Sequence, residues 1–275
     1  MKRILLVWLY VGLLSAALGC SSGGVTEEVD TDESKWVRDP VFQKMNTIVR
    51  GIDYLPFRYR LDGCYARALY MSMELAVHQL ASNVVFAFAQ PGWPLHVEST
   101  YWGYHVAPLI EVGSSADALT PMVLDPALSP VPVTKQAWMA LMGFPDPAAS
   151  GAPSMLMVPG SDYQPARARA ERTWKNKDVP DFAHLPRFRT SDVQAACAVM
   201  HLDIGLEHYQ DVTGDDGMGT GESAPIATYD GGGPSASQKR AKLLSRTLVL
   251  LRMLRARGKL TEDATFSATR CRTGY

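Results

Sequence analysis

The sequence predicts a globular protein that mixes α-helices with β-strands. Of its 275 residues, 47% are hydrophobic and 20% are charged, a balance that allows a sizeable buried core. Segments whose apolar residues recur at helical spacing alternate with short runs of β-branched and aromatic residues, so both kinds of element are expected in one chain. The length favours one domain, or one domain with an appendage.

The first well-marked helix is expected over residues 67–80. Its apolar residues lie along one side, at Leu69, Met73, Ala76, Val77 and Leu80. Asp62 and Gly63 form a turn signal directly before it, which places Cys64 just before the helix or in its first turn. Ordered structure is expected to begin earlier, over residues 36–59.

Three strands are expected after this helix. Residues 84–89 and 101–112 are rich in β-branched and aromatic side chains, and a short third run at 122–124 ends at Asp125. Pro108 interrupts the second run, because proline lacks the N–H that a ladder needs. We therefore expect a sheet edge, a bulge or the end of regular pairing at that position.

The next segments predict a short helix and two irregular connections. Residues 133–142 have helical spacing, with Thr134 as the N-cap. Residues 145–186 are rich in proline, alanine and polar side chains, which indicates a long irregular connection. Residues 211–234 are rich in glycine and aspartate and predict a loop.

Two longer helices are expected in the C-terminal region. Residues 191–209 begin with Ser191 and carry Gln194 three residues later, which is the spacing of a capping box. Residues 236–257 carry leucines at helical spacing, and Gly258 marks the end of that helix.

The N-terminal residues predict export. Lys2 and Arg3 precede an apolar run at residues 4–18 that is too short and too early for an ordinary membrane-spanning helix. The run ends in the sequence ALGC, which resembles a bacterial lipobox and predicts a signal peptide over residues 1–19 with lipidation of Cys20. Plain secretory cleavage at the same place, with Cys20 incidental, is the alternative.

Residues 20–35 are small, polar and acidic, so they predict a lipid-anchored linker between the membrane and the folded part. The expected location is the cell envelope, as an outer-membrane lipoprotein, or the medium, as a secreted protein. Lys2 and Arg3 belong to the signal peptide, so 25 of the 27 basic residues remain beside 28 acidic ones. No basic tract accompanies this balance, and nucleic acid is not an expected partner.

Cys64, His105 and Asp125 follow one another as the three groups of a catalytic triad would. The free N–H groups and positive dipole of a helix start favour the thiolate form of a cysteine placed there. A neighbouring imidazole pairs with that thiolate, and a carboxylate on the other ring nitrogen sets the tautomer of the imidazole. The alternative is a buried cysteine with a purely structural role.

The sequence around each of these residues resembles a motif of the bacterial protein glutaminases, also called protein-glutamine deamidases. The run DGCYARA at residues 62–68 resembles the nucleophile motif of that family, YHVAP at 104–108 its histidine motif, and LDP at 124–126 its acid motif. Trp138 stands where the family has a tryptophan-bearing helix. The sequence departs from the family at Leu69, where a histidine is frequent.

This resemblance implies an α+β fold of the papain and transglutaminase-like type, with the nucleophile helix packed on an antiparallel sheet. It implies a catalytic core over residues 36–145 and a helical region over 146–275 that completes or caps the core. The implied reaction is hydrolytic deamidation of glutamine side chains in proteins or peptides through a thioester, without a cofactor. The expected partners are proteins or peptides with exposed glutamine, and the protein is expected to be a monomer.

Other readings of the sequence stay open beside this one. A transglutaminase or a cysteine peptidase would use the same scaffold, and a non-enzymatic envelope lipoprotein would keep the fold for binding. Trp102 and Tyr104 are candidates for lining the substrate groove, although packing in the core is an equally good role for both.

The remaining cysteines predict one disulfide. Beyond the inner membrane thiols are open to oxidation, and lipidation of Cys20 leaves three cysteines to assign. Cys197 and Cys271 lie outside the expected catalytic core, so we predict that they are bonded and that Cys64 stays free. The spacing of the cysteines includes no CxxC pair, and no metal site is expected.

Overall fold

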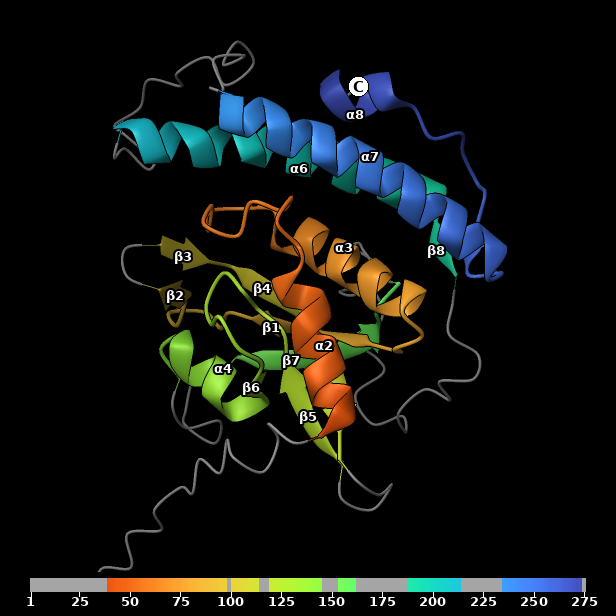
Figure 1. The fold of residues 1–275 in the computed structure, drawn as a ribbon. Helices are drawn as coiled ribbons and strands as arrows, with labels where there is room; N and C mark the ends of the chain where they lie inside the picture. Colours follow the sequence, from red (N-terminus) through yellow and green to blue (C-terminus); the bar gives the residue numbers. More distant parts are fainter. Residues whose placement is uncertain are drawn as a thin grey trace, which may run out of the picture. The chain divides into compact units, whose positions relative to one another are not determined.

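The computed structural model describes residues 39–97, 100–113, 119–144, 153–161, 187–213 and 234–273 (Figure 1). The expected signal peptide, lipidation site and linker lie outside the described residues. Most residues of the two segments expected to be irregular, 145–186 and 211–234, also lie outside the described residues. Within the part of the chain that is described, no helix is both long enough and apolar enough to cross a bilayer.

A five-stranded sheet forms the centre of the fold, with the strand order β6-β5-β4-β1-β7 (Figure 1). Its strands are β1 (Asn83–Phe88), β4 (Tyr104–Val112), β5 (Thr120–Val123), β6 (Val133–Thr134) and β7 (Ser154–Pro159). Every neighbouring pair in this sheet is antiparallel. The combination of an antiparallel sheet with separate helices confirms the expected α+β class.

Helix α3 (Cys64–Val77) lies between the sheet and two long helices, α6 (Thr190–Thr213) and α7 (Pro234–Ala256) (Figure 1). Twelve of its fourteen residues are buried, since it is covered on both sides. Leu69 belongs to this buried set, and its apolar side chain joins the main hydrophobic cluster. The sequence predicted an apolar stripe along one side of this helix, whereas its packing needs apolar residues almost all round.

The remaining elements are short. Helix α2 (Pro40–Arg50) contacts α3, and helix α4 (Lys135–Leu141) contacts β5 and β6. Strands β2 (Leu95–Val97) and β3 (Thr100–Trp102) form an antiparallel pair. Strands β8 (Phe188–Arg189) and β9 (Leu260–Thr261) form a parallel pair. Helix α8 (Ala268–Thr273) follows β9. The Thr134 hydroxyl accepts the Ala137 N–H at 3.2 Å, so it caps α4 as predicted.

Pro108 lies inside β4, with β1 and β5 on its two sides. Towards β1 the pairing continues through it, opposite Val84. Towards β5 the strand pairing begins only at Leu109, and the Pro108 carbonyl accepts the N–H of Leu124, just past the end of β5. The proline thus occupies the end of regular pairing on one side of an internal strand.

Two sequence-based expectations need correction. Strand β7 lies inside the segment 145–186 that was expected to be irregular, and it completes the sheet by pairing with β1. The capping box at the start of α6 does not form, because Ser191 bonds to Asp263 through its N–H at 3.0 Å and its hydroxyl at 2.6 Å. Gln194 likewise accepts the N–H of Ser267 instead of returning to its own helix end.

A disulfide joins Cys197 of α6 to Cys271 of α8, and Cys64 is the free cysteine of the described part. Both bonded residues are fully buried.

We expect non-reducing peptide mapping to recover this one crosslink. Because the bond closes a loop with a sequence separation of 74, its removal in Cys197→Ser/Cys271→Ser should lower the free energy of unfolding. The loss should be about 4 kcal/mol on the chain-entropy model. A crosslink that contains Cys64 in active protein would contradict the pairing.

Candidate active site

Three different elements bring Cys64, His105 and Asp125 towards one another. Cys64 is the first residue of α3, His105 is the second residue of β4, and Asp125 follows β5. Strands β4 and β5 are neighbours in the sheet, and α3 packs against β4. Sequence positions 64, 105 and 125 therefore meet at one end of the sheet.

The turn before Cys64 requires a glycine. Gly63 has a φ of +74°, which is the left-handed conformation that glycine adopts most easily, and its N–H bonds to the Asp62 carboxylate at 2.7 Å. A side chain here would also collide with α6, since a Cβ on Gly63 would lie 1.9 Å from Oδ2 of Asp203. No capping side chain accepts a hydrogen bond from the N–H groups in the first turn of α3.

His105 and Asp125 form a buried pair. Nε2 of His105 lies 2.8 Å from Oδ2 of Asp125, and the indole N–H of Trp138 donates to the same oxygen at 2.8 Å. Burial alone raises the pKa of Asp125, but the charge of His105 and these two hydrogen bonds outweigh it and hold the pKa below its ordinary value. The carboxylate is thus ionised and fixes the orientation of the imidazole ring.

His105 retains its proton more strongly than an ordinary histidine. Burial by itself lowers its pKa, whereas the charge and hydrogen bond of Asp125 and the proximity of Cys64 raise it, with a net value of about 9. Its second ring nitrogen, Nδ1, is buried and makes no hydrogen bond of ordinary geometry with the residues described. Since Nε2 is held by Asp125, Nδ1 is the ring nitrogen that the carboxylate does not engage.

Trp102 packs directly on the histidine. The rings of Trp102 and His105 are stacked with centroids 4.7 Å apart, and the indole N–H donates to the Arg60 carbonyl at 2.9 Å. Only 7% of Trp102 is exposed. Tyr104 is half-buried, with Phe86 and Phe88 beside its ring. Both contacts are packing contacts within the fold, and a role in binding substrate stays a prediction for each residue.

Two charged residues, Arg67 and Asp203, are buried near the turn that precedes Cys64. Arg67 donates to the Tyr59 carbonyl at 2.8 Å, and its Nη2 has no partner among the described residues. Asp203 of α6 is buried, which raises its pKa to about 7; Arg67 opposes this rise, and Asp62 and Glu207 add to it. No local pattern marks Asp203, because only the crossing of α6 over α3 brings it here.

Helix α6 also bonds to the backbone that precedes the turn at Asp62 and Gly63. Glu207 lies one helical turn after Asp203, is buried, and accepts the backbone N–H of Arg58 at 2.9 Å. Lys239 of α7 pairs with the same carboxylate at 2.5 Å, and the Arg58 side chain bonds to Asp211 at 2.6 Å. The C-terminal helices therefore help to fix the backbone before Cys64.

In the described ranges, no group of three or more histidine, cysteine, aspartate or glutamate side chains is placed to hold a metal ion.

Comparisons with known proteins relate the first half of the described chain to one family. Residues 39–142 match a family model described as a glutaminase. A crystal structure of protein-glutaminase is 23% identical, with 46% of this chain and 74% of that chain covered and a TM-score of 0.38. The NMR structure of protein-glutaminase from Chryseobacterium proteolyticum is 18% identical, with 70% and 95% covered and a TM-score of 0.41.

A crystal structure of pro-protein-glutaminase is 24% identical, with 47% of this chain and 48% of that chain covered and a TM-score of 0.36. No curated protein gives a significant match. The family match spans Cys64, His105 and Asp125 together, and it agrees with the resemblance inferred from the three motifs. Residues 39–142 of this protein are therefore similar to the glutaminase family.

Proposed function

We propose that this protein hydrolyses the side-chain carboxamide of glutamine in proteins or peptides, which releases ammonia and leaves glutamate. The observation that carries the proposal is the free Cys64 at an uncapped helix start, beside the buried pair of His105 and Asp125. The glutaminase match over residues 39–142 supports the choice of glutamine as the substrate side chain.

In the first half of the reaction, the Cys64 thiolate attacks the carboxamide carbon and a C–S bond forms. The oxygen becomes an oxyanion, for which the backbone N–H of Cys64 at the start of α3 is a suitable donor. His105, held as the imidazolium beside Asp125, gives its proton to the nitrogen as the C–N bond breaks. Ammonia leaves, and a thioester remains on Cys64.

In the second half, the neutral His105 takes a proton from a water molecule, which attacks the thioester carbon. The C–S bond breaks, and the products are a glutamate side chain and the free enzyme with its thiolate–imidazolium pair restored. One water is consumed and one ammonia is released in each cycle. Asp125 remains ionised throughout, because its task is to orient the ring and stabilise the imidazolium.

Product analysis distinguishes this reaction from its alternatives on the same scaffold. A glutamine-containing protein is incubated with the enzyme, ammonia is measured, and the substrate is examined by peptide mass spectrometry. We expect ammonia and conversion of glutamine to glutamate in an intact chain. Cleaved chains would favour a peptidase, isopeptide crosslinks a transglutaminase, and an unchanged substrate a binding protein; each of these results would contradict the proposal.

The substrate should be glutamine within a peptide chain. A groove that recognises backbone on both sides of the side chain gains binding that the free amino acid lacks, and the free amino acid must also lose water from its charged ends. Asparagine is one methylene shorter, and such a displacement from attack geometry costs on the order of a hundredfold in rate. We expect a blocked glutamine dipeptide to release ammonia much faster than a blocked asparagine dipeptide or free glutamine. Equal or faster turnover of free glutamine would instead indicate a small-molecule amidase.

A further inference from the structure

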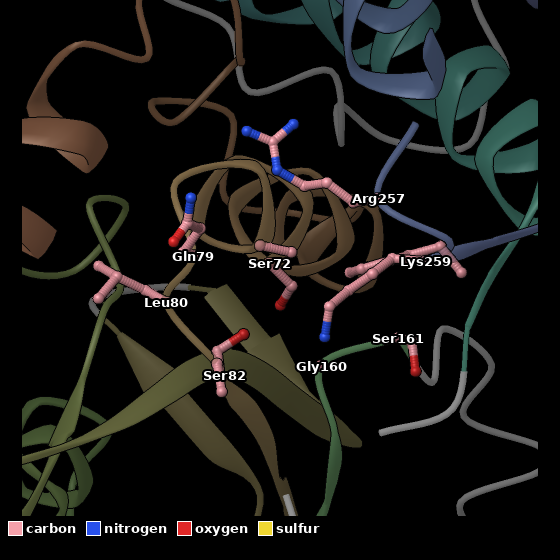
Figure 2. Close-up of a pocket in the computed structure, with 11 residues that line it drawn as sticks. Ser72, Gln79, Leu80, Ser82, Gly160, Ser161, Arg257 and Lys259 are labelled. Atoms are coloured by element: carbon pink, nitrogen blue, oxygen red, sulfur yellow. The ribbon is translucent and has the colours of Figure 1, made fainter. Parts of the chain in front are cut away.

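A cavity of about 390 Å³ lies at the other end of α3, away from Cys64 (Figure 2). Its polar lining is formed by Ser72, Gln79, Ser82, Ser161, Arg257 and Lys259. Ser72 comes eight residues after Cys64, so the two lie about 12 Å apart along the helix axis. The cavity is thus separate from the candidate active site, and its walls combine the sheet, α3 and the end of α7.

The described residues that line the cavity carry a net positive charge. Two cationic side chains, Arg257 and Lys259, line it, and none of the lining residues that the structure describes is acidic. Figure 2 shows the Lys259 ammonium group and the Ser72 and Ser82 hydroxyl groups turned into the same space. A Cβ built on Gly160 would lie 2.5 Å from the Ser82 hydroxyl and 2.9 Å from that of Ser72, so both hydroxyls converge on the glycine.

Two hydroxyls in the cavity lack hydrogen-bond partners. The oxygens of Ser72 and Ser161 are buried, and neither bonds to any residue in the described part of the chain. A buried hydroxyl without a partner is unfavourable, because folding has removed its hydrogen bonds to water. An acceptor bound in the cavity beside the Ser72 hydroxyl would satisfy that donor.

The cations are not needed to neutralise the end of α3. Backbone hydrogen bonds close that end, from Leu80 to the Leu75 carbonyl at 2.9 Å and from Gln79 to the Ala76 carbonyl at 3.1 Å. The carbonyl of His78 accepts a bond from Lys44 at 2.6 Å. Neither Arg257 nor Lys259 is among these partners, and the Arg257 guanidinium donates to the Met253 carbonyl of α7 at 3.4 Å.

Gln79 lines the cavity and lies directly after the end of α3. Its φ is +63°, and it is the single non-glycine residue with a positive φ in the described ranges. Glycine or asparagine ordinarily takes this position at a helix end, because a larger side chain is strained there. Here the strained position carries an amide side chain that lines the cavity.

We propose that this cavity binds a small oxyanion, namely a carboxylate, sulfate or phosphate group. Lys259 supplies the opposite charge, and the hydroxyls of Ser72 and Ser82 donate hydrogen bonds to the bound oxygens. Arg257, at the exposed rim, attracts the anion from solvent. The site is independent of the proposed reaction, since none of its residues belongs to the group around Cys64.

The test measures binding of sodium sulfate, sodium phosphate and sodium acetate to the full chain at constant ionic strength, with chloride as the reference salt. Calorimetry should show saturable binding of at least one of the three. Lys259→Ala should raise its Kd by about tenfold or more, and Ser72→Ala by several-fold, as expected for loss of a charged partner and a donor. Arg252→Ala removes an exposed positive charge of α7 outside the cavity and should leave the Kd within about twofold.

A second set of ligands identifies the source of the anion. Stronger binding of a peptide with a free C-terminal carboxylate than of its amidated counterpart would support a peptide end as the ligand, and preference for inorganic phosphate would support a free ion. Cys64→Ala should bind the same anions as the wild type, which separates this test from the proposed reaction. Absence of saturable binding for all three salts, or an unchanged Kd in Lys259→Ala, would overturn the site.

Discussion

Replacement of Cys64 by alanine should abolish ammonia release from glutamine peptides and leave the fold intact. The substitution removes the sulfur that forms the covalent intermediate, and no neighbouring group in the mechanism replaces it. Loss of a nucleophile of this kind costs roughly a thousandfold or more in rate. The fold should tolerate the change, because Cys64 is a small side chain at the first position of α3 and alanine is an excellent helix former.

The measurement is steady-state ammonia release by purified wild type and variant, together with circular dichroism and thermal unfolding of both. A matching unfolding curve with no activity assigns the loss to chemistry. A variant that is folded and still works at the wild-type rate would show that Cys64 is not the nucleophile. Cys64→Ser keeps the shape of the side chain and should also be severely impaired, since an alcohol is a far weaker nucleophile than a thiolate.

The Asp125→Asn variant should lose on the order of a hundredfold in kcat/KM, and its activity should decline at a lower pH than that of the wild type. Asp125 raises the pKa of His105 through its charge and its hydrogen bond, against the opposing effect of burial. Asparagine has no charge, so the imidazolium loses its proton at lower pH and the thiolate–imidazolium pair fails earlier as the pH rises. The amide also permits the wrong ring tautomer.

Rate profiles against pH test this prediction. The basic limb of kcat/KM should move towards neutral pH in Asp125→Asn, starting from the wild-type limb that a His105 pKa of about 9 sets. Trp138→Phe is the graded control, because it removes one hydrogen bond to Asp125 and leaves the carboxylate charge in place. Its limb should move less. An Asp125→Asn profile that coincides with the wild-type profile would show that this carboxylate does not act on His105.

The sequence was most informative where structure depends on neighbouring residues. A glycine turn, a helical apolar pattern and the motif around Cys64 lie within a few positions, so the start of α3 was predictable. The β1 and β4 strands were predictable for the same reason, since their side chains suit a buried sheet. The order and spacing of the three motifs then indicated which residues belong together.

Features that depend on distant contacts were not predictable in this way. The β7 strand lies in a segment whose composition resembles a connection, and it is a strand because β1 offers it hydrogen bonds. Ser191 is a suitable local cap, yet Asp263 competes successfully for its N–H and hydroxyl. Asp203 reaches Gly63 only through the crossing of two helices. In each case a tertiary partner outweighs the local preference.

The place of β7 has a practical consequence for anyone who expresses part of this protein. The family-matched segment ends at residue 142, before β7, so a chain cut there would leave β1 with a row of unpaired N–H and carbonyl groups. It would also uncover the face of α3 where Tyr70 bonds to Thr247 of α7 at 2.7 Å. An open strand beside exposed apolar surface pairs readily with other chains, so such a fragment should aggregate. The unit to express runs through α8.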